Sequence, residues 1–198
     1  MKKIGFLMTL LLFATATFAQ SAKSVLDKAA AAVSNQNGVS ANFTMTTKNG
    51  STSGTIAIKG NKFHATTPQA IVWFDGKTQW TYLKKNEEVN VNTPTPAEQQ
   101  AVNPYNFINM YKKGYKYTMN ASGNEYIVHL TATNKSAKIQ EMFINVDKSS
   151  YVPTQAKMRE GSKWTTFTLS NLKKSTLSDG LFRFNSKDYP SAEVIDLR

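Results

Sequence analysis

The sequence predicts a mainly β protein in which about eleven short antiparallel strands form one sheet, with few helices. From Val39 onward, apolar residues recur at every second position, as on strands with one buried face. Asn, Asp and Gly residues interrupt this alternation at hairpin spacing. Helical segments are too few for a βαβ arrangement. An antiparallel sheet of so many strands is expected to curl or close on itself.

The N-terminus has the features of an export signal. Lys2 and Lys3 precede an almost wholly apolar run, Ile4–Phe13, and Thr17-Phe18-Ala19 ends in the small residue that signal peptidase needs. The apolar run is too short to span a membrane. We therefore expect a signal peptide over residues 1–19, although a mature start near Ser21 fits as well. Residues 20–198 then form a single domain in the periplasm. The alternative is that residues 1–19 form an N-terminal core helix.

Composition limits the classes of function. The 198 residues carry a formal net charge of +11 and include no cysteine. Disulfides, thiolate catalysis and a lipid anchor at the cleavage point are therefore excluded. A basic chain suits nucleic acid, anionic membranes or acidic partners. Export argues against nucleic acid, and because the lysines are scattered, a solvated basic surface is the simpler alternative.

One helix is expected before the strands, over Ser21–Gln36. Its apolar residues fall on one stripe at helical spacing, namely Val25, Leu26, Ala29, Ala30 and Val33. Ser24 is the expected N-cap and Gly38 the expected stop. The alanines make this helix thin enough to lie close to a sheet.

Strands and turns then alternate to the end of the chain. Asn49-Gly50 and Gly60-Asn61 mark the first turns, and the proline-rich segment Asn92–Asn103 is a loop. Asn103-Pro104 is typical of a helix start, so a second, short helix is expected over Pro104–Lys113. The main expected strands are Val39–Met45, Thr52–Lys59, Lys62–Ala65, Tyr115–Met119, Tyr126–Leu130, Lys138–Val146, Pro153–Arg159, Trp164–Leu172, Leu181–Phe184 and Glu193–Leu197.

The segment Ile71–Val91 is expected to form two strands joined at Asp75-Gly76, the hairpin with the largest apolar surface. Asp75-Gly76 favours a two-residue type I′ turn, which would pair Phe74 with Lys77 and Trp73 with Thr78. Paired residues point to the same face. One face then carries Ile71, Trp73, Trp80 and Tyr82, and the other carries Val72, Phe74, Lys77, Gln79 and Thr81. We expect the tryptophan-bearing face to line a cavity or to meet a second element.

The sequence argues against catalysis and against a metal or other cofactor. His64 and His129 lie far apart in sequence, without the further ligands that a metal site needs. The pair Glu87-Glu88 would point to opposite faces of a strand, so it cannot form an acid–base dyad. No Gly-x-Ser-x-Gly elbow and no glycine-rich phosphate loop is present.

The run Ala57–Tyr82, with IVWFDGKTQWTY at its centre, resembles the signature stretch of periplasmic outer-membrane lipoprotein carriers, the LolA-like family. The similarity continues in order along the chain, through Ser40–Thr44, Met142–Val146, Thr166–Leu172 and Phe182–Phe184. It implies a mainly β fold with helices, in which an incomplete, unclosed antiparallel β-barrel is covered by helices. The cavity between sheet and helices would hold the acyl chains of a lipoprotein.

The resemblance also implies site residues and partners. The helices Ser21–Gln36 and Pro104–Lys113 would be lid elements. The partners would be acylated lipoproteins, an inner-membrane lipoprotein-releasing transporter and an outer-membrane acceptor, and the carrier itself a monomer. The residues expected to line the apolar cavity are Leu26, Val33, Phe43, Met45, Ile56, Ile58, Phe63, Ile71, Trp73, Trp80, Tyr82, Phe107, Met110, Tyr111, Met142, Ile144, Phe167 and Leu169.

The chain departs from the family pattern at one position. Carriers of this family often have an arginine followed by proline after the second strand, and that arginine helps to latch the lid. Here the segment is Lys59-Gly60-Asn61. Two other functions fit the same composition: a carrier of another amphiphile such as a glycolipid, and an exported structural or adhesion domain whose aromatic residues are only core.

Overall fold

The computed structural model describes residues 21–34, 36–95 and 111–198. They form one α-helix, α1 (Ala22–Val33), twelve strands and two 3-10 helices, η1 (Asp179–Phe182) and η2 (Ser186–Asp188). The expected signal peptide and most of the expected second helix lie outside these residues. The strands are β1 (Val39–Thr47), β2 (Gly50–Lys59), β3 (Lys62–Thr66), β4 (Ala70–Phe74), β5 (Gln79–Leu83), β6 (Glu88–Asn92), β7 (Tyr115–Ser122), β8 (Glu125–Ala132), β9 (Glu141–Asp147), β10 (Pro153–Glu160), β11 (Lys163–Lys174) and β12 (Glu193–Asp196).

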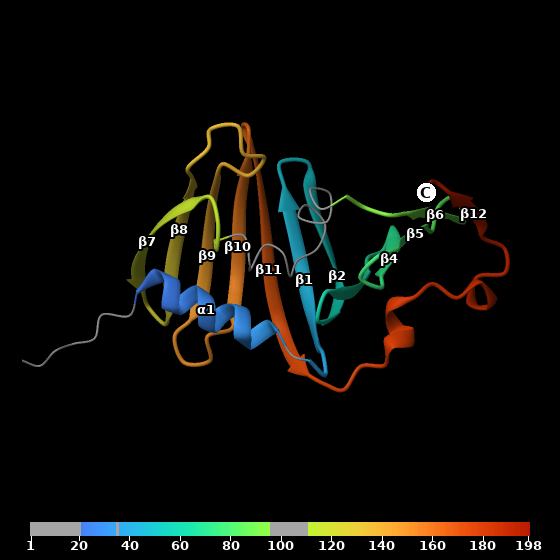
Figure 1. Cartoon of the computed structure of the whole chain (residues 1–198), viewed down its shortest axis with the longest axis horizontal. Helices are drawn as coiled ribbons and strands as arrows, with labels where there is room; N and C mark the ends of the chain where they lie inside the picture. Colours follow the sequence, from blue (N-terminus) through green and yellow to red (C-terminus); the bar gives the residue numbers. More distant parts are fainter. Residues whose placement is uncertain (1–20, 35, 96–110) are drawn as a thin grey trace, which may run out of the picture.

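All twelve strands belong to one unclosed sheet, in the order β12-β6-β5-β4-β3-β2-β1-β11-β10-β9-β8-β7. The centre of the sheet joins the two halves of the chain, because β1 pairs antiparallel with β11 along most of its length. The sheet twists strongly, as Figure 1 shows: β7–β11 are seen face on with α1 lying across them, whereas β4–β6 are turned away from that view. The expected unclosed antiparallel β fold is confirmed.

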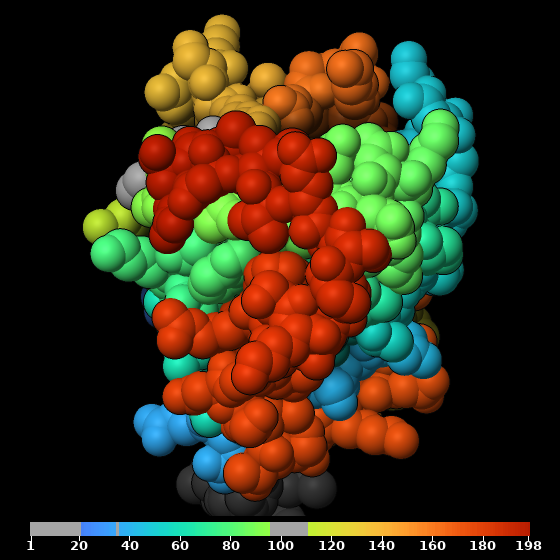
Figure 2. All heavy atoms as spheres, turned by 90° about the vertical axis from the view of Figure 1, so that its right-hand side faces the viewer, coloured from blue at the N-terminus to red at the C-terminus, as the bar shows by residue number. Residues whose placement is uncertain are grey.

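The C-terminus differs from the sequence-based expectation in two ways. Leu181–Phe184 is not a strand, since residues 179–182 form η1. The last strand, β12, pairs parallel with β6 and not antiparallel. Residues 175–192 connect β11 at the centre of the sheet to β12 at its edge, and we call this segment the C-terminal crossover. Figure 2 shows it lying over the strands of this end of the sheet.

Helix α1 buries the stripe that the sequence predicts. Val25, Leu26, Ala29, Ala30 and Val33 are all buried. The N-cap is Ser21, whose Oγ accepts a hydrogen bond from the Ser24 amide at 3.1 Å, so the expected cap at Ser24 is wrong by one turn. The apolar stripe packs on a cluster of β8–β10 residues that includes Val128, Leu130, Met142, Ile144, Val146 and Met158.

A second apolar cluster lies on the same face, further along the sheet. It contains Val39, Ala41, Ile56, Ile58, Phe63 and Phe74, with Phe43, Val72 and Leu169 packed against them. Its members connect to the α1 cluster through the central strands, because Phe43 pairs with Leu169 and Met45 with Phe167. Successive apolar residues two positions apart therefore form one continuous inner face, which we define as the face that carries α1.

The expected two-strand hairpin over Ile71–Val91 is three strands, β4, β5 and β6, and its β4–β5 turn is wider than expected. Trp73 pairs with Trp80 and Phe74 with Gln79, so the loop contains four residues and not two. The Asp75 carboxylate explains the extra length, because its Oδ1 accepts hydrogen bonds from the amides of Lys77 (3.0 Å) and Thr78 (2.8 Å). The pairing therefore differs by two residues from the type I′ prediction. An even shift keeps each side chain on its expected face.

Candidate ligand-binding site

A cavity of about 830 Å³ lies on the inner face at one end of β1, β10 and β11. Its volume is within the usual range of about 300–1,000 Å³ for small-molecule sites. Four parts of the chain enclose it: the inner face of the sheet, the turn before β7, the β8–β9 connection and the β10–β11 turn. The lining residues are Met45, Lys112, Lys113, Gly114, Tyr115, Asn134, Ala137, Lys138, Ile139, Met158, Glu160, Lys163, Thr165 and Phe167.

The floor of the cavity is apolar and comes from three neighbouring strands. Met45 on β1 pairs with Phe167 on β11, and Met158 on β10 pairs with Thr165 on β11. Met158 is buried, whereas Met45 and Phe167 are half-buried. Methionine side chains are flexible and polarisable, so they adapt to ligands of irregular shape. This floor suits an apolar ligand without a fixed shape.

One wall of the cavity is fixed by a hydrogen bond. The Tyr115 hydroxyl donates to the Ile139 carbonyl at 2.8 Å, which ties the start of β7 to the β8–β9 connection. Burial raises the pKa of Tyr115 above its usual value, so its hydroxyl remains a donor at neutral pH. The wall beside Ile139 is therefore held in place without a charged group.

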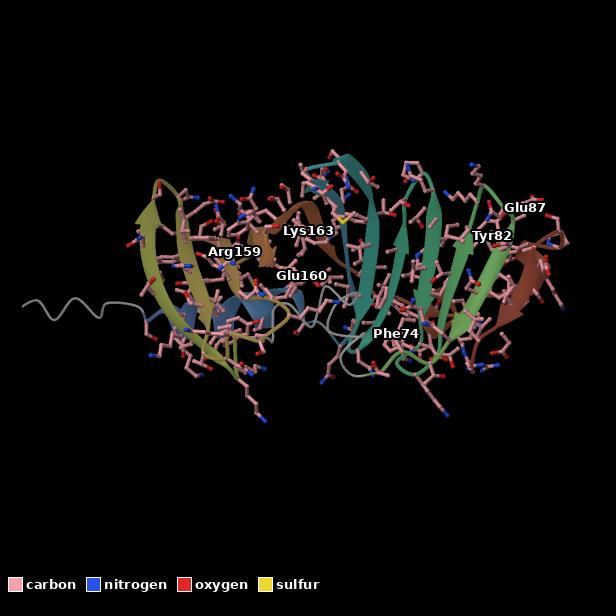
Figure 3. The ribbon with its side chains drawn as sticks, turned by 90° about the horizontal axis from the view of Figure 1, so that it is seen from above. Phe74, Tyr82, Glu87, Arg159, Glu160 and Lys163 are labelled. Atoms are coloured by element: carbon pink, nitrogen blue, oxygen red, sulfur yellow. The ribbon has the colours of Figure 1, made fainter. Side chains whose placement is uncertain are left out.

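The mouth of the cavity is cationic. Lys112, Lys113, Lys138 and Lys163 line it and are exposed, and Glu160 is the acidic residue among its lining residues. Glu160 pairs with Lys163 across the β10–β11 turn, where Figure 3 labels both residues. The cavity thus combines an apolar floor with a positively charged opening.

Helix α1 holds the turn that carries two of these lysines. The buried Tyr111 donates its hydroxyl hydrogen to Asp27 Oδ1 at 2.5 Å. Lys23 lies on the other carboxylate oxygen at 2.7 Å. The hydrogen bond from Lys23 lowers the pKa of Asp27 most, and the hydrogen bond from Tyr111 lowers it further. Burial raises the pKa of Tyr111, and its hydrogen bond to Asp27 adds to this shift. A negative Asp27 and a neutral Tyr111 thus form a stable pair at neutral pH.

Of the predicted site residues that the structure describes, two line the cavity, Met45 and Phe167. Most others lie on the inner face but are packed into its two clusters, namely Leu26, Phe43, Ile56, Ile58, Phe63, Tyr111, Met142, Ile144 and Leu169. Val33 is buried on α1. Phe107 and Met110 lie outside the described residues. The other lining residues that matter here were not predicted from the sequence, namely Met158, Tyr115, Ile139 and the four lysines. Met158 could have been found, because it belongs to the alternating apolar set of β10.

The structure corrects the prediction that four residues of the hairpin line the cavity. Phe74 and Val72 pack in the inner-face cluster, so Ile71, Trp73, Trp80 and Tyr82 point to the opposite, outer face. The turn fixes which residues share a face, but it does not determine which face meets the helix. These residues therefore do not line the cavity, which lies on the inner face.

The C-terminal crossover covers this outer aromatic face instead. The Tyr189 ring centroid lies 5.5 Å from that of Trp73 and 4.8 Å from that of Tyr82, and Phe184 also contacts Trp73. Ion pairs hold the crossover at the strand ends: Arg183 lies 3.2 Å from Asp75, and Asp179 lies 2.9 Å from Lys59 and 3.1 Å from Lys62. The aromatic surface of the hairpin is thus covered by the C-terminal part of the same chain.

Both histidines contact neighbouring side chains of the sheet. His129 Nε2 lies 2.9 Å from Glu141 and its ring stacks on Phe143 at 4.3 Å. His64 packs beside Trp73, and burial lowers its pKa. Within residues 21–34, 36–95 and 111–198, no three His, Asp or Glu side chains form a group that could hold a metal ion. In the same part of the chain, no helix has the length and apolarity that crossing a membrane requires.

Comparison with solved structures identifies a protein with the same fold, and two further structures with lower similarity scores. An uncharacterised conserved protein from Thermus thermophilus superposes with a TM-score of 0.60 at 10% identity, covering 88% of this chain and 98% of that one. A LolA superfamily protein from Nitrosomonas europaea gives a TM-score of 0.46 at 14% identity, covering 83% and 98%. LprF from Mycobacterium bovis gives 0.46 at 11% identity, covering 79% and 96%.

A search of the curated proteins finds no match. A family model does match, over residues 12–162, and it is described as outer membrane lipoprotein carrier protein LolA. This match covers most of the sheet, α1 and eleven of the fourteen residues that line the cavity. The chain therefore belongs to the family of the outer membrane lipoprotein carrier protein LolA.

Proposed function

We propose that this protein is a periplasmic carrier that binds the acyl chains of lipoproteins and shuttles them from the inner to the outer membrane. The observation that carries the proposal is the apolar cavity of about 830 Å³ on the inner face, with Met45, Met158 and Phe167 as its floor. Membership in the LolA family supports the same role.

The energetics of acyl chains explain why such a carrier is needed. Each methylene transferred from lipid to water costs about 0.8 kcal/mol, so a sixteen-carbon chain costs about 12 kcal/mol to leave its membrane. A cavity that buries part of the chain offsets part of this cost. Because the cavity is open at its cationic end, its ligand can leave again when a membrane or an acceptor offers deeper burial.

Membership in the LolA family supports a proposal for the partners. A carrier of this kind receives its cargo from an inner-membrane lipoprotein-releasing transporter and delivers it to an outer-membrane acceptor. It works by binding and release, and we assign no catalytic residue, metal or cofactor to it. We expect it to act as a monomer, with residues 1–19 removed on export.

A carrier of another amphiphile is the second candidate, because the floor of the cavity makes no contact that is specific to a lipoprotein. The ring of lysines at the mouth favours this candidate, since a lipoprotein's acylated end offers no obvious anion for them. A structural or adhesion domain fits less well, because such a domain has no use for an apolar cavity of this volume.

Displacement of a fluorescent fatty acid tests the proposal. An acylated lipopeptide should displace the probe, and the same peptide without acyl chains should not. Met45→Glu places a carboxylate on the apolar floor and should weaken probe binding at least tenfold, because an unpaired charge is disfavoured there. The matched control is Thr46→Glu, on the exposed opposite face of the same strand, and it should bind normally.

Two results would contradict the proposal. One is a probe that the lipopeptide cannot displace, which would rule out lipoprotein acyl chains as cargo. The other is equal binding by the Met45→Glu and Thr46→Glu variants, which would place the probe away from this cavity. Circular dichroism of both variants checks that each remains folded.

A further inference from the structure

The charged residues that line the cavity are mostly lysines, and they lie at its mouth. Lys112 and Lys113 come from the turn before β7, Lys138 from the β8–β9 connection and Lys163 from the start of β11. A neighbouring cavity of about 350 Å³ shares Lys163 and adds Lys48 from the β1–β2 turn. Four separate parts of the chain thus bring lysines to one end of the sheet.

Acidic side chains near this mouth are few. Glu160 lines the cavity, but none of the four lysines lies within salt-bridge distance of a carboxylate among the residues that the structure describes. Glu141 is nearby in sequence, but it is occupied by His129 and Arg159 on the outer face. Counted over the described lining residues, four lysines against one glutamate give a net charge of about +3. Asp27 on α1 also acts on Lys112, but its carboxylate is already paired with Lys23.

An apolar floor below a cationic rim matches one kind of molecule. The floor accepts hydrocarbon, and the rim stabilises a negative charge placed at the end of that hydrocarbon. We infer that the preferred ligand of this cavity is an anionic amphiphile, whose acyl chain contacts Met45, Met158 and Phe167 and whose phosphate or carboxylate headgroup lies among Lys112, Lys113, Lys138 and Lys163. This inference rests on the acyl-chain binding of the proposed function and, of its two candidates, it favours the carrier of another amphiphile, whose headgroup it specifies.

The exposure of the lysines determines how the preference should behave. Ion pairs at an exposed rim are screened by salt, and raising the ionic strength from about 0.1 M to about 1 M shortens the Debye length from about 10 Å to about 3 Å. Binding of the acyl chain depends on apolar burial and is not weakened in this way. Headgroup selectivity should therefore decline with salt while acyl-chain binding remains.

The test compares two lysophospholipids that have the same acyl chain, lysophosphatidylglycerol, which is anionic, and lysophosphatidylcholine, which is zwitterionic. Both are titrated below their micelle concentrations against the wild type and two triple variants. The first variant, Lys113→Gln with Lys138→Gln and Lys163→Gln, removes charge from the rim. The matched control removes the same charge from exposed lysines outside the cavity lining, by Lys77→Gln with Lys85→Gln and Lys187→Gln.

We expect the wild type to prefer the anionic lipid, and the rim variant to bind it about tenfold more weakly, the size that several exposed ion pairs produce together. Affinity for the zwitterionic lipid should not change, and the control variant should behave as the wild type does. High salt should reduce the wild-type preference.

Equal affinity of the wild type for both lipids would overturn this inference but leave the proposed acyl-chain carrier intact. Binding of neither lipid would overturn both. If the rim variant binds both lipids normally but no longer associates with vesicles of anionic phospholipid, the lysines dock the protein on a membrane, and the inference about the cavity ligand is wrong.

Discussion

Asp75 connects two distant parts of the molecule at the end of β4. Its Oδ1 accepts hydrogen bonds from the amides of Lys77 and Thr78, and its Oδ2 lies 3.2 Å from Arg183 in the C-terminal crossover. The next residue, Gly76, has a φ of +99° and lies against the Asn61 amide group, so a side chain there would be strained and crowded. The Asp-Gly pair thus indicates a turn, but the Asp side chain selects a wider turn than the sequence pattern suggests.

Substitutions at Asp75 separate its two roles. Asp75→Asn keeps an oxygen that can accept both turn bonds and loses only the ion pair to the exposed Arg183, so it should cost no more than about 0.5 kcal/mol of unfolding free energy. Asp75→Ala also leaves two turn amides without their acceptor and should cost about 1–2 kcal/mol. Urea unfolding measures both values. Equal costs for Asn and Ala would show that the ion pair, and not the turn, is the important interaction.

At the scale of elements, alternation along strands predicts which residues share a face but not what covers that face. Ile71, Trp73, Trp80 and Tyr82 do share a face, as the sequence predicts, because the register shift of two preserves parity. That face meets Phe184 and Tyr189, not α1. The covering segment is more than a hundred residues away in sequence, and no local pattern encodes its position.

Helix α1 was predictable because its apolar stripe has a clear period, and the structure confirms all five stripe residues as buried. Its contact with the turn before β7 was not predictable, since the hydrogen bond from Tyr111 to Asp27 joins residues 84 positions apart. This hydrogen bond ties α1 to the turn that bears Lys112 and Lys113. It therefore positions part of the cavity mouth.

Tyr111→Phe tests that link. The ring remains buried while the hydrogen bond is lost, and because Asp27 is partly exposed, water compensates for some of the loss. The expected cost is about 0.5–1.5 kcal/mol of unfolding free energy at pH 7. The lowered pKa of Asp27 means that its bonds stabilise the fold above the ordinary value of 3.8 and stop doing so as pH falls through the lower folded-state pKa.

The cost of Tyr111→Phe should therefore be largest near neutral pH and should shrink below about pH 4. Urea unfolding of the wild type and the variant at both ends of this range gives the difference directly. A cost that stays constant with pH would show that the ionised Asp27 is not the partner that matters.

At the scale of the whole molecule, the strand pattern predicts one antiparallel sheet that curls or closes, and the resemblance to LolA-like carriers implies that it is unclosed, but neither gives the strand order. Local hairpins were predictable from turn residues, whereas the pairing of β1 with β11 and the parallel pairing of β12 with β6 join segments that no turn connects. The cavity depends on these long-range pairings, because Met45 meets Phe167 only across the β1–β11 contact. Met45 and Phe167 could still be named from the sequence because each belongs to an alternating apolar strand pattern, whereas the lysines of the mouth belong to no such pattern.

Photo-crosslinking with a fatty acid that carries a diazirine at its methyl end tests the central claim most directly. After irradiation, mass spectrometry of the digested protein locates the attachment sites. We expect labelling on the inner face at or beside Met45, Met158 and Phe167, and we expect excess unlabelled fatty acid to prevent it. Labelling that is concentrated instead on Trp80, Tyr82 or residues 178–192, or labelling that excess fatty acid does not reduce, would contradict an acyl-chain site on the inner face.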